Sequence, residues 1–382
     1  MAKVFPFKGF FYRPEQNSYR DLLAPPYDVI SPEEKNGLLE RSSHNVVRLI
    51  LPESFAAAKR DFRNWLEQRV FSQDEEPVFY WCRQDYQFNG LPRIGRGMVA
   101  LLGLEELKKG SVYPHEETIP GIRQEQFQLL SEVEANFCPI IILYRDRKMV
   151  AETIAAEAEK EPPFISYEDD RGVKFSLWKI RPFPELPEIF SGQKVFIADG
   201  HHRYSSAYQH FMQQGSESCG FVLTYFLNSF SDDTTVLPFH RYLPGLKEQD
   251  LAPVWERFQF QPEPDLKSLL GNLSSGWLGA TVAGKFFRFA VSEETKAELE
   301  VSFLQRTIVN QILNRSDDEV SFDPDAQSLL DKVRREGGVA FFLPPLLPLR
   351  LHEVWEKEVI LPRKSTCFYP KIPSGLVIYK HK

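Results

Sequence analysis

The sequence predicts an α+β fold in which mixed sheets are flanked by helices. Asn89-Gly90 is a strong hairpin-turn signal, and it lies between two strand-like segments at residues 77–88 and 94–104. Apolar residues at helical spacing, as in Ser54–Val70, predict helices elsewhere in the chain. A mixture of hairpins and helices favours α+β over a purely parallel, doubly wound sheet.

The first 50 residues are rich in proline and turn residues, and one helix is expected among them. Ser31 can cap a helix that begins at Pro32 and either ends near Asn36-Gly37 or runs on to about Arg41. After the hairpin, periodicity and composition predict further elements in alternation. These are a helix over 124–136, a buried strand over 140–144, a helix over 150–160 and a strand over 173–180.

The central region predicts a strand, a polar turn and a helix in direct succession. Lys194–Ala198 is a short buried strand, Asp199–Arg203 is the turn, and a helix follows over Tyr204–Gln214. Phe221–Leu227 is the next buried strand. Beyond about residue 246, helical and strand-like pieces alternate, and residues 361–382 are expected to be loop-like. We therefore expect three parts: an N-terminal α+β part at 1–110, a core at 111–245 and a C-terminal α+β part at 246–382.

Composition excludes several classes of protein. The net charge is 46 − 53 = −7, which argues against binding nucleic acid over a broad basic surface. No apolar run approaches the roughly 18–20 residues of a membrane span, and the N-terminus does not resemble a secretory signal. The four cysteines are far apart and form no CxxC pair, so we expect reduced thiols in a cytoplasmic protein.

The sharpest chemical signal is the segment Asp199-Gly200-His201-His202-Arg203-Tyr204. The amides of a first helical turn can bind an anion, and a glycine lets a ligand approach the backbone closely. The guanidinium of Arg203 suits phosphate oxygens, and the two histidines can donate hydrogen bonds or shuttle a proton.

Two other interpretations of this segment stay open. Asp199 could simply cap the helix, which would make the histidines incidental. His201 and His202 could instead belong to a zinc site, although no HExxH or HxH spacing accompanies them.

The proline-set turn at Tyr27-Asp28 is the second candidate. Asp28 could act as a general base or as a magnesium ligand, or it could be an ordinary turn aspartate before a helix. Weaker candidates are basic or polar groups that are equally typical of solvated surface. They are Arg48 with His44, His115 with Glu116, His240 with Arg241, and Lys364 with Ser365. The chain has no Walker, protein-kinase, GxSxG or post-strand GxGxxG motif.

Taken in order, these motifs resemble the bacterial and archaeal "domain of unknown function 1015" family almost from end to end. They are Ala24–Ser31, His44-Asn45 with Arg48, His115-Glu116 with Thr118, Ala135–Phe137 before Pro139, Ala198–Tyr204, Leu237-Pro238 with His240-Arg241, and Lys364–Thr366 with Phe368, Pro370-Lys371 and Ser374–Leu376. The chain departs from the family pattern at Glu117, where a basic or neutral residue is frequent. It also lacks the expected His-Asp pair near Phe322–Asp325.

The Asp199–Arg203 segment is also similar to the phosphate-binding turn of the ParB/sulfiredoxin superfamily, which includes nucleotide-dependent free L-serine kinases. The resemblance implies a ParB/sulfiredoxin-like nucleotide-binding core and a phosphotransferase that uses ATP or ADP. Its acceptor would be a small hydroxy amino acid, with L-serine the leading candidate. In the serine kinases an acidic residue of the N-terminal part acts as base, which implies that role for Asp28 here.

The resulting hypothesis assigns a role to each candidate. Residues Asp199–Tyr204 hold the nucleotide, and His201, His202 and Arg203 neutralise charge in the transition state. Mg²⁺ is held by Asp199, Glu116 or Asp28. The substrate-binding candidates are Tyr27, Arg48, His115, Glu116, His240, Arg241, Lys364 and Ser365. The partners expected are the nucleotide and a small-molecule substrate, with a homodimer as the candidate assembly. The alternatives are a nucleotide-binding regulatory module and a metal-dependent hydrolase built around His201 and His202.

Overall fold

A computed structural model describes residues 1–13, 18–88, 90–116, 120–291 and 299–381. The chain forms two compact units. The large unit comprises Met1–Pro114, Thr118–Thr235 and Pro370–Lys382, and the small unit comprises His115–Glu117 and Val236–Tyr369. The C-terminal segment from Pro370 therefore returns to the unit that contains the N-terminus.

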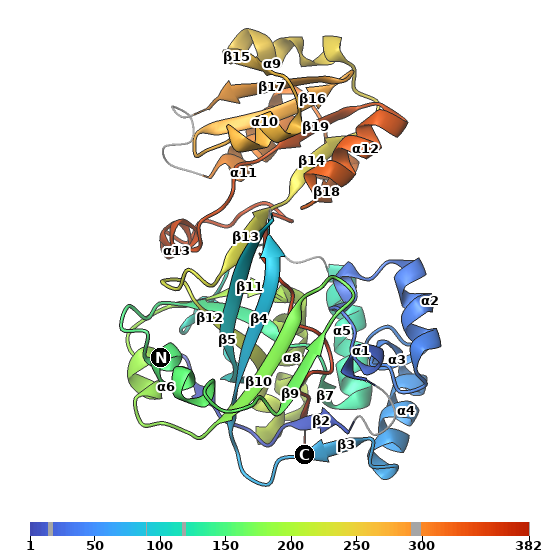
Figure 1. Cartoon of the computed structure of the whole chain (residues 1–382), viewed down its shortest axis with the longest axis vertical. Helices are drawn as coiled ribbons and strands as arrows, with labels where there is room; N and C mark the ends of the chain where they lie inside the picture. Colours follow the sequence, from blue (N-terminus) through green and yellow to red (C-terminus); the bar gives the residue numbers. More distant parts are fainter. Residues whose placement is uncertain (14–17, 89, 117–119, 292–298, 382) are drawn as a thin grey trace. The chain divides into compact units, whose positions relative to one another are not determined.

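The main sheet of the large unit mixes parallel and antiparallel strands (Figure 1). Its order is β6-β11-β8-β12-β5-β4-β10-β9, with β1 paired to β5. The strands are β1 (Val4–Phe5), β4 (Phe79–Phe88), β5 (Leu91–Gly103), β6 (Val112–Pro114), β8 (Ile140–Tyr144), β9 (Ile165–Glu168), β10 (Lys174–Ile180), β11 (Val195–Asp199) and β12 (Phe221–Asn228). β8 is parallel to β12, and β6 is parallel to β11, whereas β4 and β5 form the predicted antiparallel hairpin.

This sheet explains why the chain forms two units rather than the three predicted parts. Six residue pairs join β5, in the predicted N-terminal part, to β12, in the predicted core. Strand hydrogen bonds therefore cross the boundary that we placed near residue 110. Sequence periodicity does not show which strands pair, so it could not reveal this continuity.

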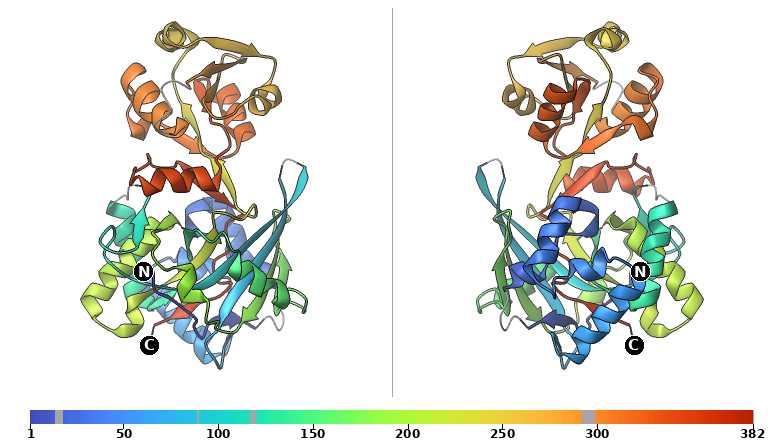
Figure 2. Two further views of the ribbon diagram at one scale, coloured as in Figure 1. Left: turned by 90° about the vertical axis from the view of Figure 1, so that its left-hand side faces the viewer. Right: turned by 90° about the vertical axis from the view of Figure 1, so that its right-hand side faces the viewer.

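Helices of the large unit bury their apolar faces against the sheet and against one another. The helices are α1 (Tyr19–Leu22), α2 (Pro32–Arg41), α3 (Val47–Ile50), α4 (Phe55–Glu67), α5 (Pro120–Val133), α6 (Val150–Ala158), α7 (Leu186–Ile189) and α8 (His201–Gln214). One core cluster joins Ala100 of β5 to Ala155 of α6 and Ala207 of α8. Helices α3, α4, α5 and α8 pack in succession. Figure 2 shows the teal α5 beside the yellow-green α8. Ser31 caps α2 by accepting a hydrogen bond from the Glu34 amide, as predicted.

The small unit has its own sheet and its own core. The sheet order is β15-β17-β16-β19-β14-β18. The strands are β14 (His240–Leu243), β15 (Phe260–Glu263), β16 (Trp277–Val282), β17 (Lys285–Ala290), β18 (Ser321–Asp323) and β19 (Val339–Phe342), and the helices are α9 (Ala252–Arg257), α10 (Leu266–Gly271), α11 (Glu300–Phe303), α12 (Ala326–Glu336) and α13 (Pro348–Glu356). Helix α11 continues into a π-helical segment, η4 (Leu304–Ile312). Leu269 of α10 and Leu330 of α12 pack with Phe342 of β19.

The mixed architecture confirms the predicted α+β class. Where single elements differ from the prediction, the cause is the pairing of short strands with distant partners. The stretch 361–382, expected to be loop-like, contains two short strands, β20 (Thr366–Tyr369) and β21 (Tyr379–Lys380). β21 pairs with β7 (Ala135–Asn136), where we expected the end of a helix. Strands this short gain their hydrogen bonds from distant partners, which leaves little signal in the sequence. No helix among the described residues is long and apolar enough to cross a bilayer.

Candidate functional site

The strand and the helix predicted around Gly200 are present, and the turn between them is a single residue. β11 ends at Asp199 and α8 begins at His201, so Gly200 alone makes the turn. Its φ is +88°, in the left-handed region that glycine tolerates. A Cβ atom there would lie 2.8 Å from Cγ2 of Ile140 and 3.0 Å from Cζ of Arg203. The sequence needs glycine at this position for both reasons.

Gly200, and not Asp199, occupies the N-cap position of α8. No side chain of the described chain caps this helix. The alternative in which Asp199 caps the helix is therefore wrong. Its carboxylate instead accepts hydrogen bonds from two cationic side chains.

Opposite charges surround Asp199. Its Oδ2 lies 2.8 Å from Nζ of Lys371 and 3.1 Å from a terminal guanidinium nitrogen of Arg203. Burial alone would raise the pKa of Asp199, but the charges of Lys371 and Arg203 hold that pKa well below its usual range. Nζ of Lys371 also lies 3.9 Å from Oδ2 of Asp28. Lys371 therefore links the central turn to the proline-set turn.

Backbone contacts explain how Lys371 reaches this position. The Ser374 amide donates to the Ala24 carbonyl over 2.8 Å, and the Gly375 amide donates to the Phe137 carbonyl over 2.7 Å. The C-terminal segment therefore lies beside Ala24, shortly before Asp28 in the sequence. Tyr27 and Asp28 form a short 3₁₀ turn, η1 (Tyr27–Val29), directly after the two prolines.

Arg203 anchors the turn to the neighbouring backbone. One terminal nitrogen donates to the Cys138 sulfur over 2.7 Å and also to the Pro139 carbonyl, while the other donates to Asp199. Burial raises the pKa of the Cys138 thiol, and the charge of Arg203 opposes that shift. These contacts use both ends of the guanidinium, so Arg203 acts chiefly by positioning Asp199 and the turn.

A small hollow, partly open to solvent, adjoins Arg203 within the large unit. Its lining includes the polar residues Tyr27, Gln126, Asn136, Cys138, Arg203 and Ser206, and the remaining lining residues are apolar. Burial is the largest cause that raises the pKa of Tyr27, so its phenol stays protonated and can donate a hydrogen bond.

Two residues of the predicted nucleotide-binding segment, His201 and Tyr204, are buried, whereas His202 is half-buried. Tyr204 is fully buried, and its hydroxyl donates to the Glu105 carbonyl over 2.8 Å and accepts from the Glu105 amide over 3.1 Å. A role for Tyr204 in holding a cofactor is corrected, because both capacities of its hydroxyl are used inside the fold.

Arg48, a further substrate-binding candidate of the large unit, lies on α3. Its guanidinium donates to the Leu39 carbonyl over 3.0 Å. The neighbouring Asn45 is fully buried and shapes the loop that leads to the prolines. Its amide donates to the carbonyls of Asp21 and Leu23 and accepts from the Val47 amide.

The other predicted substrate residues belong to the small unit, where several of them are neighbours. His115 lies 3.1 Å from the Thr366 hydroxyl, and the Glu116 carboxylate accepts from the Lys364 amide over 2.9 Å. Buried Arg241 donates to the Lys364 carbonyl over 3.1 Å. Ser365 donates to the Pro362 carbonyl, and buried His240 accepts from the Leu343 amide over 3.2 Å. Glu117 and Thr118 lie outside the described residues.

Two of the three carboxylates predicted as alternatives for Mg²⁺, those of Asp199 and Glu116, do not suit that ion. Oδ2 of Asp199 is already held by two cations, and Oε1 of Glu116 accepts a backbone amide. A hard divalent cation prefers carboxylate oxygens that are not already paired with cations. Among the described residues, the group of three clustered side chains that could hold a metal ion is His210, Cys219 and His381, and includes neither His201 nor His202.

Lys371 is the site residue that sequence reasoning did not select. Lys371 follows the basic group at Lys364 and belongs to the Pro370-Lys371 motif of the family resemblance. Neither observation gives it a role of its own, because charge in such stretches is usually solvated. Its partner Asp199 lies in another part of the sequence. Their contact depends on the course of the C-terminal segment, which no local pattern encodes.

Comparison with protein families gives a match over most of the chain. A family model described as "Protein of unknown function (DUF1015)" matches residues 4–309. No curated protein matches the sequence.

Several solved structures are similar at low identity. A free serine kinase in complex with AMP is 12% identical, with 73% of this chain and 98% of that chain covered at a TM-score of 0.41. A conserved hypothetical protein from Pyrococcus furiosus is 12% identical, with coverage of 69% and 90% and a TM-score of 0.38. C-terminally truncated SbnI from Staphylococcus aureus is 11% identical, with coverage of 72% and 85% and a TM-score of 0.41.

Proposed function

The chain belongs to the DUF1015 family of proteins of unknown function, and we propose that it is a nucleotide-dependent phosphotransferase. The donor is ATP or ADP, and the acceptor is the hydroxyl group of a small hydroxy amino acid, with free L-serine as the leading candidate. One observation carries the proposal. Lys371, Arg203 and Asp28 converge on the Asp199-Gly200 turn at the start of α8, beside a partly open hollow.

Charge and backbone direction at the turn suit phosphate groups. The start of an α-helix carries a partial positive charge and presents amides, and Gly200 adds no side chain of its own there. The Lys371 ammonium has three donors and already spans two carboxylates. A bound phosphate would share this ammonium with Asp199, so Lys371 is the residue that we assign to charge neutralisation.

Asp28 is the proposed general base. Its side chain is 24% exposed, which leaves the carboxylate accessible to a substrate hydroxyl. In the proposed step Asp28 takes the hydroxyl proton while the hydroxyl oxygen attacks the terminal phosphorus. The bond from that phosphorus to the nucleotide oxygen breaks, so ATP would leave as ADP, or ADP as AMP.

The hollow beside Arg203 is assigned to the rest of the nucleotide. Apolar side chains such as Ile50, Leu129 and Phe137 form much of its wall, which suits a planar base better than a zwitterionic amino acid. Similarity of the Asp199–Arg203 segment to the turn of the free serine kinases supports the same assignment. The substrate roles of Arg48, His115, Glu116, His240, Arg241, Lys364 and Ser365 stay predictions.

The test combines a binding assay with a turnover assay. We expect purified protein to bind ATP or ADP and to form O-phosphoserine only when L-serine is added. Asp28→Asn should lower turnover about 10²- to 10⁴-fold, the usual contribution of a general base, and should keep nucleotide affinity. Asp331→Asn, on an exposed surface of α12, is the matched control and should leave both unchanged.

The outcomes separate the proposal from its alternatives. Nucleotide binding without any serine-dependent product would point to a regulatory module, in which the nucleotide acts as a conformational switch. A chain that binds no adenine nucleotide and releases no product would remove the proposal altogether.

A further inference from the structure

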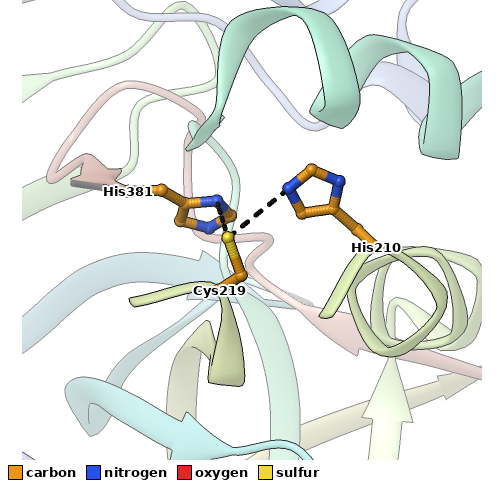
Figure 3. Close-up of side chains that lie close together, drawn as sticks. All are labelled: His210, Cys219 and His381. Carbon is orange, nitrogen blue, oxygen red and sulfur yellow. Dashed lines mark hydrogen bonds between the residues drawn. The ribbon is translucent and has the colours of Figure 1, made fainter. Parts of the chain in front are cut away.

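Two imidazoles and a thiol meet inside the large unit, away from the Gly200 turn. His210 lies near the end of α8, Cys219 lies in η2 (Glu217–Gly220), and His381 follows β21. Their exposed fractions are 0%, 5% and 2%. Figure 3 shows that each imidazole directs a ring nitrogen at the sulfur atom. Three ligands of these two types, drawn from three segments, are typical of a transition-metal site.

The spacing of the donor atoms fits a tetrahedral ion. Nε2 of His210 and Nδ1 of His381 each lie 3.6 Å from Sγ of Cys219, and all three donors lie within 4.8 Å of one another. Zinc bonds of about 2.3 Å to sulfur and about 2.0–2.1 Å to nitrogen, at a tetrahedral angle, require a sulfur–nitrogen separation of about 3.6 Å. Both observed separations match this requirement before any ion is present.

We propose that His210, Cys219 and His381 form a zinc-binding site. Zinc is bound through Nε2 of His210, Nδ1 of His381 and the Cys219 thiolate, with a water molecule as the fourth ligand. Binding releases the thiol proton to solvent, since the thiolate is the form that ligates a metal. Burial lowers the pKa of His210 and that of His381, the latter to about 4, so both imidazoles are neutral and able to ligate at neutral pH.

The surroundings of His210 already suit a bound ion. Its other ring nitrogen, Nδ1, lies 3.2 Å from the Ser131 hydroxyl. An imidazole that binds zinc through Nε2 carries its proton on Nδ1 and usually donates it to an oxygen. Ser131 provides that oxygen on α5.

Asn136 sets the proton position of His381 in the metal-free chain. Its amide oxygen accepts from the Leu223 amide over 2.9 Å, so its NH₂ group faces Nε2 of His381 at 3.5 Å. That contact places the His381 proton on Nδ1, directed at Cys219. Zinc replaces this proton and requires it on Nε2, opposite the Asn136 NH₂ group. Asn136 is therefore a mismatched neighbour that weakens zinc binding.

This mismatch allows an experiment to distinguish a metal site from a buried hydrogen-bond network. Asp at position 136 could still accept from Leu223 with one oxygen and could accept the Nε2 proton of His381 with the other. Outer-shell partners of this kind change metal affinity about 10- to 100-fold. Asn136→Asp should therefore tighten zinc binding about tenfold, an effect that a metal-free network does not explain.

A bound ion would fasten the C-terminal segment to α8. Protein contacts already hold this segment, since β21 pairs with β7 and the Tyr379 hydroxyl donates to the Ser218 carbonyl over 2.7 Å. The same segment carries Lys371, and α8 carries Arg203. Zinc would connect the two elements that meet at Asp199, which gives the site a structural role in the large unit.

The experiment uses the full chain and zinc alone, without nucleotide. We expect competition with a chromogenic chelator to show one zinc per chain. Co²⁺ should bind the same site and give the near-ultraviolet charge-transfer absorption of a thiolate ligand. Cys219→Ser and His381→Ala should each weaken zinc binding at least 100-fold. Cys82→Ala removes a buried thiol outside the cluster, and should retain both the stoichiometry and the absorption.

Cobalt binding is measured on the unchanged chain. The proposal can therefore be tested even if the variants that remove a ligand fail to fold. Co²⁺ that binds without thiolate absorption would overturn the proposal, as would zinc binding below one tenth of an equivalent. Zinc affinity unchanged by Asn136→Asp would overturn the assignment of His381 as a ligand. Nucleotide binding and phosphoserine formation are separate readouts, so failure here does not bear on the proposed function.

Discussion

Nζ of Lys371 lies 2.8 Å from Oδ2 of Asp199 and 3.9 Å from Oδ2 of Asp28. A residue of the C-terminal segment therefore completes a charge arrangement whose other members come from the proline-set turn and the centre of the chain. The Lys371 side chain is only 11% exposed, so water screens these interactions weakly. The proposed phosphate site consequently depends on the return of residues 370–382 to the large unit.

Lys371→Met tests this dependence. Removing one partner of a largely buried ion pair leaves a carboxylate poorly compensated, although Arg203 still contacts Asp199. We expect the free energy of unfolding to fall by about 1–3 kcal/mol and nucleotide affinity to fall at least tenfold. Urea titration and equilibrium nucleotide binding measure the two effects. Lys59→Met, which removes an exposed pair with Glu132, should change neither by a measurable amount.

Gly200→Ala tests the need for glycine at the turn. Two costs are expected: a left-handed backbone for alanine, about 1–2 kcal/mol, and a Cβ atom 2.8 Å from Ile140. Gly215→Ala is the matched control at the other end of α8, because its φ is +66° and nothing lies within 4 Å of its Cβ position. We expect Gly215→Ala to lose about 1 kcal/mol of unfolding free energy and Gly200→Ala clearly more. Equal losses in the two variants would show that the close contact is unimportant.

The sequence was sufficient to predict those helices, strands and turns that depend on a pattern of a few neighbouring residues. β8 occupies Ile140–Tyr144, as predicted from a continuous apolar run, and the strand–turn–helix order around Gly200 is also as predicted. These elements depend on periodicity and on turn chemistry, both of which act over a few residues. The helix start was misplaced, since α8 begins at His201 rather than Tyr204, because polar residues in a first helical turn look like loop.

Contacts between distant segments could not be predicted. Lys371 with Asp199, and His381 with Cys219 and His210, are brought together by β21 pairing with β7 and by the return of the C-terminal segment. Single residues in these segments carry no periodic signal, and their partners are fixed only when the sheet order is fixed. Tyr204 shows the opposite error: its place in a functional motif suggested a ligand contact, whereas its phenol fills the core.

Tyr204→Phe tests the structural role of that phenol. The substitution leaves the Glu105 carbonyl and amide without their buried partner, which should cost about 1–3 kcal/mol of unfolding free energy. Nucleotide affinity should remain within twofold of the unchanged protein. Tyr208→Phe, a half-buried tyrosine one turn later on α8, should cost less than about 0.5 kcal/mol. A large loss of nucleotide affinity in Tyr204→Phe, with stability preserved, would restore Tyr204 as a binding residue.

The small unit should lose stability in mild acid because of His240. Burial, and then the neighbouring charge of Arg241, lowers the pKa of His240 to about 3, whereas an unfolded histidine has a pKa of about 6.5. Between these values the unfolded chain binds a proton that the folded unit does not. Stability therefore falls as the pH drops below about 6.5, by up to about 1.4 kcal/mol per pH unit, and this group has no effect at higher pH.

Hydrogen exchange can follow this effect within the small unit, because the Leu343 amide donates to the His240 ring over 3.2 Å. A peptide that covers β19 and Leu343 should lose protection between pH 7 and pH 5, after correction for the intrinsic exchange rate. His240→Gln keeps a possible acceptor but cannot bind the proton, so the slope against pH should flatten even if the variant is less stable overall. His44→Gln, in the large unit, should leave the slope of this peptide unchanged. The same slope in His240→Gln as in the unchanged chain would mean that another group causes the acid sensitivity.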